Sequence, residues 1–428
     1  MKTSENRRYG MRVLGRDVLV SDDTRLTGLN SNDIIIGGSG AGKTGSVVIP
    51  TIQKLKSSLI VSDTKGQLER RFKDELIEKG YTVKTIDFVN PERSNTYNPL
   101  MFIRRYNDGS VREQDIMVLA RSIVPILDVH EPFWEQSAAS LVAFLIAYCV
   151  ESMPQNMQHM KTVYELYQMF ISPDESEEYC EMLSWMIDHP KSLAARKYTE
   201  IKSNKSAEKM YSSILGFASV ALEPFGFKEA GYIFGRSAGV DLANLGRKKT
   251  VLFINVSDTE PVFDKMVNLL YLQALFTLCA EADRNPDGRL NVPVRIIMDD
   301  FAASAKIENF DKITSVIRSR DIFVTIILQS LSQLESMYTK SEANTIINNC
   351  DHMLYMSGQD ESTIQYIASR AFKTPESVQT MPRNMAYLLV NGEKAKLVEK
   401  IVPYSTVSDY MCYDMEAERQ DDFEKEFS

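Results

Sequence analysis

The sequence has few cysteines and histidines, and neither residue type forms a recognisable site. Five cysteines in 428 residues include no C-x-x-C pair, which argues against a disulfide framework and favours reduced thiols in the cytosol. The four histidines show no metal-ligand spacing with one another or with cysteine, so we predict no zinc site. These residues are Cys149, Cys180, Cys279, Cys350 and Cys412, and His130, His159, His189 and His352.

Long hydrophobic runs are also missing. The longest unbroken apolar run, Leu141–Val150, has ten residues, whereas about 20 are needed to cross a bilayer. We therefore expect a buried core helix there. The N-terminal residues include basic side chains but no apolar segment followed by a cleavage site, so export is not indicated and a cytoplasmic location is favoured.

Excess positive charge is absent as well. The formal net charge is −9, which excludes a uniformly basic surface for nucleic acid. Any contact with DNA must therefore come from a local basic patch or from the inside of a pore. The composition, 44% hydrophobic and 25% charged, is that of an ordinary soluble globular protein with room for two or three domains.

The order of the predicted elements indicates a parallel α/β fold that is interrupted once. Residues 111–228 show helical spacing of apolar side chains and no strand alternation. We predict an α/β domain in two parts, 1–110 and 229–410, an all-α domain at 111–228, and an acidic tail at 411–428. The expected strands are Asp33–Ile36, Ser58–Ser62, Thr82–Phe88, Thr250–Val256, Arg295–Met298 and Ile322–Leu328, with a hairpin that joins Tyr387–Val390 to Ala395–Val398.

A phosphate-binding loop follows the first strong strand. The stretch from Gly37 to Thr44, GGSGAGKT, matches G-x-x-x-x-G-K-[ST] in full. Glycines let successive backbone N–H groups point at phosphate oxygens, Lys43 reaches the β and γ phosphates, and Thr44 ligates Mg²⁺. Pro50 should kink the helix that follows. The residues predicted to contact the nucleotide are Gly37, Ser39, Gly40, Ala41, Gly42, Lys43 and Thr44.

Three further polar motifs also end predicted strands. In RIIMDDFA, Asp299 is placed to hold Mg²⁺ through water and Asp300 to orient the attacking water; the alternative is a pair of surface carboxylates. Gln329 ends FVTIILQS with an amide that can bind the γ-phosphate or that water. Asp63 and Lys65 end SLIVSDTKG, where capping of the next helix is slightly favoured over nucleotide contact.

The positions of these residues favour one shared site. Gly37, Asp63, Asp299 and Gln329 each lie within two residues of the C-terminal end of a predicted strand. Because parallel strands end at the same edge of a sheet, residues far apart in sequence can meet there around one ligand.

Two arginines lie near the C-terminus of the helix predicted at Phe310–Arg320. Arg318 and Arg320 are two residues apart and point in different directions on a helix, so at most one can face a given active site. An arginine supplied by a neighbouring subunit would neutralise charge on the transferred phosphoryl group. A surface arginine that interacts with the helix dipole is the open alternative.

With these residues in view, the sequence resembles the type IV secretion coupling proteins, which are conjugative DNA-transfer ATPases. The resemblance covers most of Arg25–Tyr404. It rests on GGSGAGKT, SDTKG, YNPL at 97–100, PFWEQSA at 132–138, MDDFA, VIRSRDIFVTIILQSLSQL and NNCDHMLYMSG, in this order. Several of these motifs are distinctive of that family rather than of P-loop proteins in general.

The resemblance implies a RecA-like P-loop NTPase core interrupted by an all-α domain. It further implies a homo-hexameric ring that uses ATP and Mg²⁺ to pass single-stranded DNA, delivered with a relaxase, to a type IV secretion channel. The family's arginine finger falls on Arg318 and its γ-phosphate sensor on Gln329. PFWEQSA opens the helical domain, where we favour core packing of Phe133 and Trp134 over base stacking.

Two features depart from the family pattern. Many members carry N-terminal membrane spans and this sequence shows none, so we expect either a membrane-anchoring partner at the inner face of the cell membrane or a soluble variant. Asp300 stands where much of the family has Glu, which draws the carboxylate back by about 1.5 Å. We expect Asp300 still to polarise water, with its loop moved inward.

A basic segment is the candidate for contact with DNA. Residues 191–209 hold six Lys or Arg against two Glu, and a solvated helical face is favoured over a path for the phosphate backbone. Three functions remain open at this point. They are a coupling motor, another ring-shaped DNA pump for partition or packaging, and an adaptor in which slow hydrolysis resets affinity.

Overall fold

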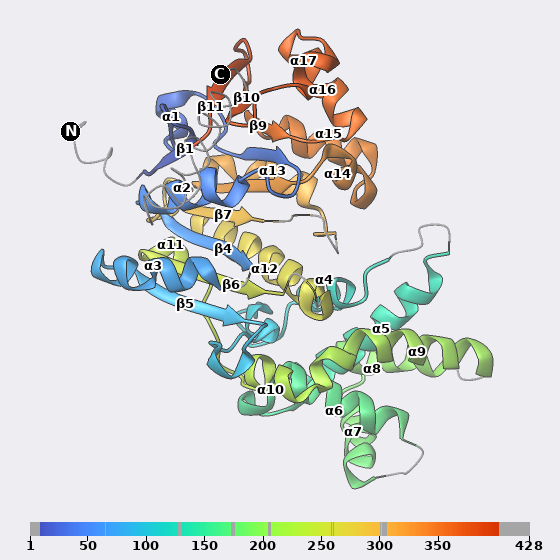
Figure 1. The fold of residues 1–428 in the computed structure, drawn as a ribbon. Coiled ribbons are helices and arrows are strands. Elements are labelled where there is room, and N and C mark those ends of the chain that lie inside the picture. Colours follow the sequence, from blue (N-terminus) through green and yellow to red (C-terminus); the bar gives the residue numbers. More distant parts are fainter. Residues whose placement is uncertain are drawn as a thin grey trace, which may run out of the picture. The chain divides into compact units, whose positions relative to one another are not determined.

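The computed structural model describes residues 9–64, 66–126, 131–172, 176–203, 207–257, 259, 261–299, 301 and 306–401 (Figure 1). The chain divides into two compact units. The first contains Met1–Leu59, Val292–Ala303 and Asp311–Ser428, and the second contains Ile60–Asn291 and Ser304–Phe310. Asp300 and the predicted acidic tail at 411–428 lie outside the described residues.

The first unit is built on a mostly parallel sheet with the strand order β11-β10-β9-β3-β8-β7. Strand β3 pairs in parallel with β8 and β9, and β7 pairs in parallel with β8. Strand β10 pairs antiparallel with β9 and β11. The bounds are β3 Asp33–Gly37, β7 Val294–Met298, β8 Ile322–Leu328, β9 His352–Ser357, β10 Met385–Val390 and β11 Lys396–Glu399.

Continuous apolar runs explain the centre of this sheet. Every residue of β3, β7 and β8 is buried, as expected for parallel strands that are covered on both faces. A two-stranded antiparallel sheet, β1 Met11–Gly15 with β2 Val18–Ser21, belongs to the same unit. The helices here are α1 Thr24–Thr27, α2 Ile49–Gln53, α13 Phe310–Val316, α14 Leu331–Met337, α15 Lys340–Asn348, α16 Glu361–Ala371 and α17 Pro375–Gln379.

The second unit has strands in the order β4-β6-β5, and the chain enters it within β4. Strands β5 and β6 are parallel. The bounds are β4 Ser58–Thr64, β5 Thr82–Asp87 and β6 Thr250–Val256. Helix α3, Gln67–Glu78, buries Leu68, Phe72 and Leu76 on the face that their spacing predicts.

Between β5 and β6 the regular elements of the described chain are helices, apart from an isolated β-bridge between Arg105 and Val111. The helices are α4 Glu113–Ile123, α5 Phe133–Ser152, α6 Met160–Ile171, α7 Glu177–Asp188, α8 Leu193–Ser203, α9 Glu208–Gly226, α10 Lys228–Phe234 and α11 Asn244–Arg247, and α12 Asp264–Ala282 follows β6. The prediction of a parallel α/β fold is therefore confirmed. The exact boundaries proposed for the domains stay a prediction.

Helix α5 contains the longest apolar run of the sequence. Its residues Leu141–Val150 are buried, which confirms the predicted core helix. Among the described helices it alone has the length and composition to cross a membrane, and 72% of its most apolar window is buried. A core helix of a globular protein passes the same test, so this is weak evidence for a span.

Candidate nucleotide site

Three of the predicted site residues lie together at one edge of the first unit's sheet. In the parallel ladders, Ile36 of β3 is opposite Leu328 of β8, and Met298 of β7 is opposite Ile326. A predicted site residue comes directly after three of these strand positions: Gly37 after Ile36, Gln329 after Leu328 and Asp299 after Met298. The structure thus brings the phosphate loop, the candidate sensor Gln329 and the first carboxylate of the MDDFA motif to the same edge.

The loop from Gly37 to Thr44 has the geometry that its glycines permit. Gly40 and Gly42 adopt positive φ angles of 74° and 83°, a region that side chains disfavour. A Cβ atom at Gly37 would lie 2.9 Å from the Cβ of Ala41, so the loop closes tightly on its own base. The exposed Ser39 and Gly40 form its tip, and the Gly38 amide is bonded to the Ser357 carbonyl of β9.

The two reactive side chains of the loop point in different directions. The Lys43 ammonium donates to the Gly37 carbonyl at 2.7 Å and to the Gly38 carbonyl at 3.3 Å, so it lies within the loop. The Thr44 hydroxyl donates to Asp299 Oδ2 at 3.0 Å. Because that proton is directed at the carboxylate, the lone pairs of the Thr44 oxygen remain free for a cation. Oxygen donors of this kind suit Mg²⁺.

The helix after the loop is irregular where Pro50 predicts a kink. Thr44–Val48 form a π-helical turn, and α2 begins at Ile49 with Pro50 in its first turn. Proline is tolerated there because first-turn amides have no partner within the helix. The π turn widens the first turn of the helix that carries Thr44.

Arg318 lies at the opposite edge of the same sheet. It belongs to a 3₁₀ turn, Arg318–Arg320, directly before β8, and donates to the Gly28 carbonyl at 2.7 Å. The seven residues of β8 separate it from the phosphate-loop edge, a length of about 20 Å. The exposed Arg318 therefore cannot reach the nucleotide edge of its own sheet.

Three residues of the predicted set have other outcomes. Asp63, in the second unit, accepts a hydrogen bond from the Glu69 amide at 2.8 Å, which supports capping of α3. Burial raises the pKa of this carboxyl. Asp300 and Lys65 lie outside the described residues.

The structure corrects the interpretation of Phe133. Its side chain is 46% exposed, so the prediction of core packing is wrong for this residue. Phe133 and Trp134 instead form an edge-to-face pair at the start of α5, with ring centroids 5.3 Å apart. Of the two side chains, that of Trp134 is partly buried and that of Phe133 is exposed.

The basic segment is partly neutralised by its neighbours. Arg196 pairs with Glu113, and Lys197 pairs with Glu200 at 2.7 Å. Lys205 lies outside the described residues. These pairs support a solvated helical face more than a continuous path for phosphates.

The sequence did not predict two contacts, one made by Lys400 in the first unit and one by Asn98 in the second. Lys400, which follows β11, lies beside the phosphate loop with Nζ 3.5 Å from the Ala41 carbonyl oxygen. No motif marks a contact across 359 positions. Asn98 of YNPL accepts from the Leu100 amide and donates to the carbonyls of Gln158 and Ser237, so this motif joins segments of the second unit.

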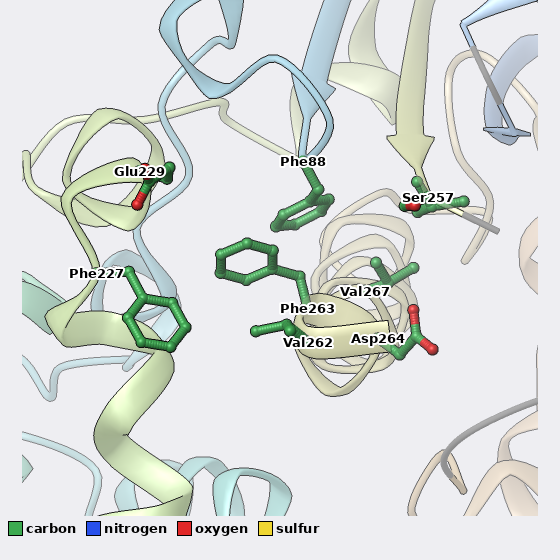
Figure 2. Close-up of a pocket in the computed structure, with 9 residues that line it drawn as sticks. Phe88, Phe227, Glu229, Ser257, Val262, Phe263, Asp264 and Val267 are labelled. Carbon is green, nitrogen blue, oxygen red and sulfur yellow. The ribbon is translucent and has the colours of Figure 1, made fainter. Parts of the chain in front are cut away.

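A separate pocket lies in the second unit, after the ends of β5 and β6. Figure 2 shows Phe88, Phe227, Val262 and Phe263 around this pocket. Its volume is about 180 Å³. Phe88 and Phe263 stack with centroids 5.4 Å apart. The lining combines these apolar side chains with the carboxylates of Glu229 and Asp264, so the pocket differs in chemistry from the glycine-rich loop.

A family model and several curated relatives match most of this chain. Residues 13–371 match the family described as type IV secretory system conjugative DNA transfer. Protein VirD4 of Rhizobium rhizogenes is 22% identical over 346 residues, which cover 80% of this chain and 49% of that protein. The probable conjugal transfer protein TraG of Sinorhizobium fredii is 22% identical over 367 residues, with 83% and 54% covered. The chain thus spans about half the length of the curated relatives it matches.

Solved structures show the same fold. The bacterial conjugative coupling protein TrwB, in complex with sulfate, superposes with a TM-score of 0.66 at 15% identity, covering 86% of this chain and 85% of that one. TrwB in complex with ADP and Mg²⁺ superposes with a TM-score of 0.64 at 14% identity, covering 87% and 85%. VirB4 of Thermoanaerobacter pseudethanolicus gives 0.53 at 14% identity, covering 92% and 97%. The predicted RecA-like P-loop architecture is therefore confirmed.

Proposed function

This chain belongs to the type IV secretory system conjugative DNA transfer family, and we propose that it is an ATP-hydrolysing coupling protein. In this role it recruits a relaxase–DNA substrate and drives single-stranded DNA into a type IV secretion channel. The observation that carries the proposal is the bond between the Thr44 hydroxyl and the Asp299 carboxylate. That bond joins the phosphate loop to an acidic strand end, which supports the proposal that the two share one cation.

The nucleotide would be ATP with Mg²⁺. TrwB, which shares the fold, has been solved with a non-hydrolysable ATP analogue and with ADP and Mg²⁺. Here the loop amides and Lys43 would bind the phosphates. Thr44 would bind the ion directly, and Asp299 would hold it through water. The bound ion would neutralise charge on the phosphate oxygens. Asp300 would orient the attacking water, and Gln329 would contact the γ-phosphate or that water.

The position of Arg318 supports the proposed assembly into a homo-hexamer. This residue and the phosphate loop lie at opposite edges of one sheet, so a catalytic role for the guanidinium requires a neighbouring subunit. A head-to-tail contact that closes generates a ring. Such a ring would enclose the path for DNA, which is consistent with a chain whose net charge is −9.

The cellular setting would be the cytoplasmic side of a secretion channel. The partners would be single-stranded DNA, a relaxase and channel proteins, with a membrane-anchoring partner where the chain is held at the inner face of the membrane. The basic residues of 191–209 that are not neutralised remain candidates for DNA contact.

The test is ATP turnover per chain as a function of protein concentration, with and without single-stranded DNA. We expect turnover to rise steeply as rings form and to rise again when DNA is added. Lys43→Ala, which removes the phosphate-binding ammonium, provides the inactive control. Turnover by a monomer, independent of concentration, would contradict the role of Arg318 in trans. Turnover that ignores DNA would favour the adaptor function.

A further inference from the structure

A lysine from the C-terminal hairpin lies against the phosphate loop. Lys400 follows β11, and its Nζ is 3.5 Å from the Ala41 carbonyl oxygen. The Lys400 amide donates to the Asn384 carbonyl at 2.8 Å, and the Ser46 hydroxyl donates to the Ile401 carbonyl at 2.7 Å. These bonds fix the segment both to the base of the hairpin and to the helix that carries Thr44.

The side chain of Lys400 is buried without an acidic partner among the described residues. It is 9% exposed, and the Ala41 carbonyl lies at the limit of hydrogen-bond distance. The adjacent carboxylate, Glu399, pairs with Arg16 at 3.0 Å instead. Burying an ammonium costs free energy unless an anion pairs with it. The position of Lys400 therefore suits the binding of an anionic ligand.

We propose that Lys400 is a second phosphate-binding lysine of the nucleotide site, which donates to a phosphate oxygen of the bound nucleoside di- or triphosphate. The proposal rests on the proposed function because it assigns a new contact to the same ligand. It makes the C-terminal hairpin part of the site. Nucleotide binding would then hold together the phosphate loop, the helix after it and the segment after β11.

The charge of Lys400 gives this contact a recognisable pH dependence. Burial lowers its pKa to about 8. Other charged groups on the elements packed against it are Lys43 of the loop, Arg383 beside Asn384, and the paired Arg16 and Glu399. A bound phosphate favours protonated Lys400, so nucleotide affinity should be constant below pH 8 and should weaken as the pH rises above it.

The experiment compares binding of a fluorescent ATP analogue to the full chain and to three variants between pH 7 and 9.5. Lys400→Met should weaken binding about 10-fold or more at pH 7 and remove the weakening above pH 8. Lys400→Arg should restore most of the affinity and show no such weakening, because arginine stays charged. Lys396→Met changes an exposed lysine that pairs with Glu393, and it should bind as the unaltered chain does.

The outcomes separate this proposal from the proposed function. Failure of the unaltered chain to bind the analogue would overturn both. Binding by the unaltered chain together with Lys400→Met affinity within twofold, or an unchanged pH profile, would overturn the role of Lys400 alone. Thermal unfolding of each variant shows whether a loss of affinity reflects a loss of fold.

Discussion

The Thr44 hydroxyl donates a hydrogen bond to the Asp299 carboxylate at 3.0 Å, across 255 positions of sequence. Thr44 follows β3 by way of the phosphate loop, and Asp299 follows β7, with β8 between those strands. The bond engages the hydroxyl proton and leaves the oxygen lone pairs available. This arrangement fits a magnesium ion that is bound to Thr44 and held by Asp299 through water.

Replacing these oxygens should remove the effect of magnesium on nucleotide affinity. In Thr44→Ala the ligand oxygen is lost, and in Asp299→Asn the affinity for magnesium should fall about 10–100-fold. Affinity in EDTA should change little because Lys43 is retained. Thr44→Ser keeps the hydroxyl and serves as the control. Nucleotide titrations with and without magnesium measure the difference, and an unchanged magnesium response in Thr44→Ala would exclude this cation position.

Mixing two inactive variants should restore ATP turnover if Arg318 acts in a neighbouring subunit. Arg318→Ala alone should lose about 10³-fold or more in turnover, and Lys43→Ala alone should be inactive. In an equal mixture, a complete site takes Lys43 from an Arg318→Ala chain and Arg318 from a neighbouring Lys43→Ala chain. Because each chain makes up half of the mixture, about a quarter of the sites are complete. No recovery in rings shown to contain both variants would refute action in trans.

A buried network of charges holds the other edge of the first unit's sheet. Arg295 pairs with Asp22 at 2.6 Å and with Asp33 at 3.1 Å, and Arg12 lies 3.4 Å from each of these carboxylates. The four side chains are almost completely buried. Removing one partner would leave a charge uncompensated in a low-dielectric interior.

Asp33→Asn should therefore be strongly destabilising. We expect a loss of about 3–5 kcal/mol in the free energy of unfolding, measured by denaturant titration. Asp17→Asn, at an exposed position in the turn between β1 and β2, should change it by less than about 0.5 kcal/mol. Equal stability of the two variants would show that the network contributes nothing.

The sequence predicts well what depends on continuous apolar runs. The strands expected at Thr250–Val256 and Ile322–Leu328 have the same bounds as β6 and β8. The shared edge of Gly37, Asp299 and Gln329 follows from the same runs, because parallel strands end together. Local pattern and one topological rule were enough for these features.

The remaining features depend on pairings that no local pattern contains. Asp33 is read as the start of a strand, yet its carboxylate meets an arginine 262 positions away. The contact of Lys400 with Ala41 spans 359 positions and follows from the path of the last hairpin. Phe133 is apolar, which predicts a place in the core, but it is the first residue of α5 and its side chain is exposed.

The YNPL motif offers a test of a structural rather than catalytic role. Asn98 is buried, and its amide nitrogen donates to the carbonyls of Gln158 at 2.8 Å and Ser237 at 2.9 Å. Asn98→Ala would leave both carbonyls without these donors, so we expect a loss of about 2–3 kcal/mol in unfolding free energy. Asn95→Ala is not a neutral control because Asn95 accepts from Thr85.

A suitable control is Asn107→Ala, at an exposed position in the second unit. Nucleotide affinity of the purified Asn98→Ala protein should stay near that of the unaltered chain, because the phosphate loop belongs to the first unit. Loss of nucleotide binding without loss of stability would contradict a purely structural role for Asn98.

Acid should weaken the first unit through His352. Burial lowers the pKa of this imidazole below its usual 6.5, with the nearby Asp33 opposing the shift and Arg12 adding to it. The unfolded chain therefore binds a proton at this residue more readily than the folded chain does. The contribution to stability is complete above about pH 6.5 and is lost as the pH falls below that value toward the folded pKa, with a slope of up to about 1.4 kcal/mol per pH unit.

His352→Gln should flatten this part of the stability profile, whereas His189→Gln keeps His352 and should retain it. Denaturant titrations from pH 5 to 8 provide the measurement, and parallel profiles for the two variants would show that His352 is not the group responsible.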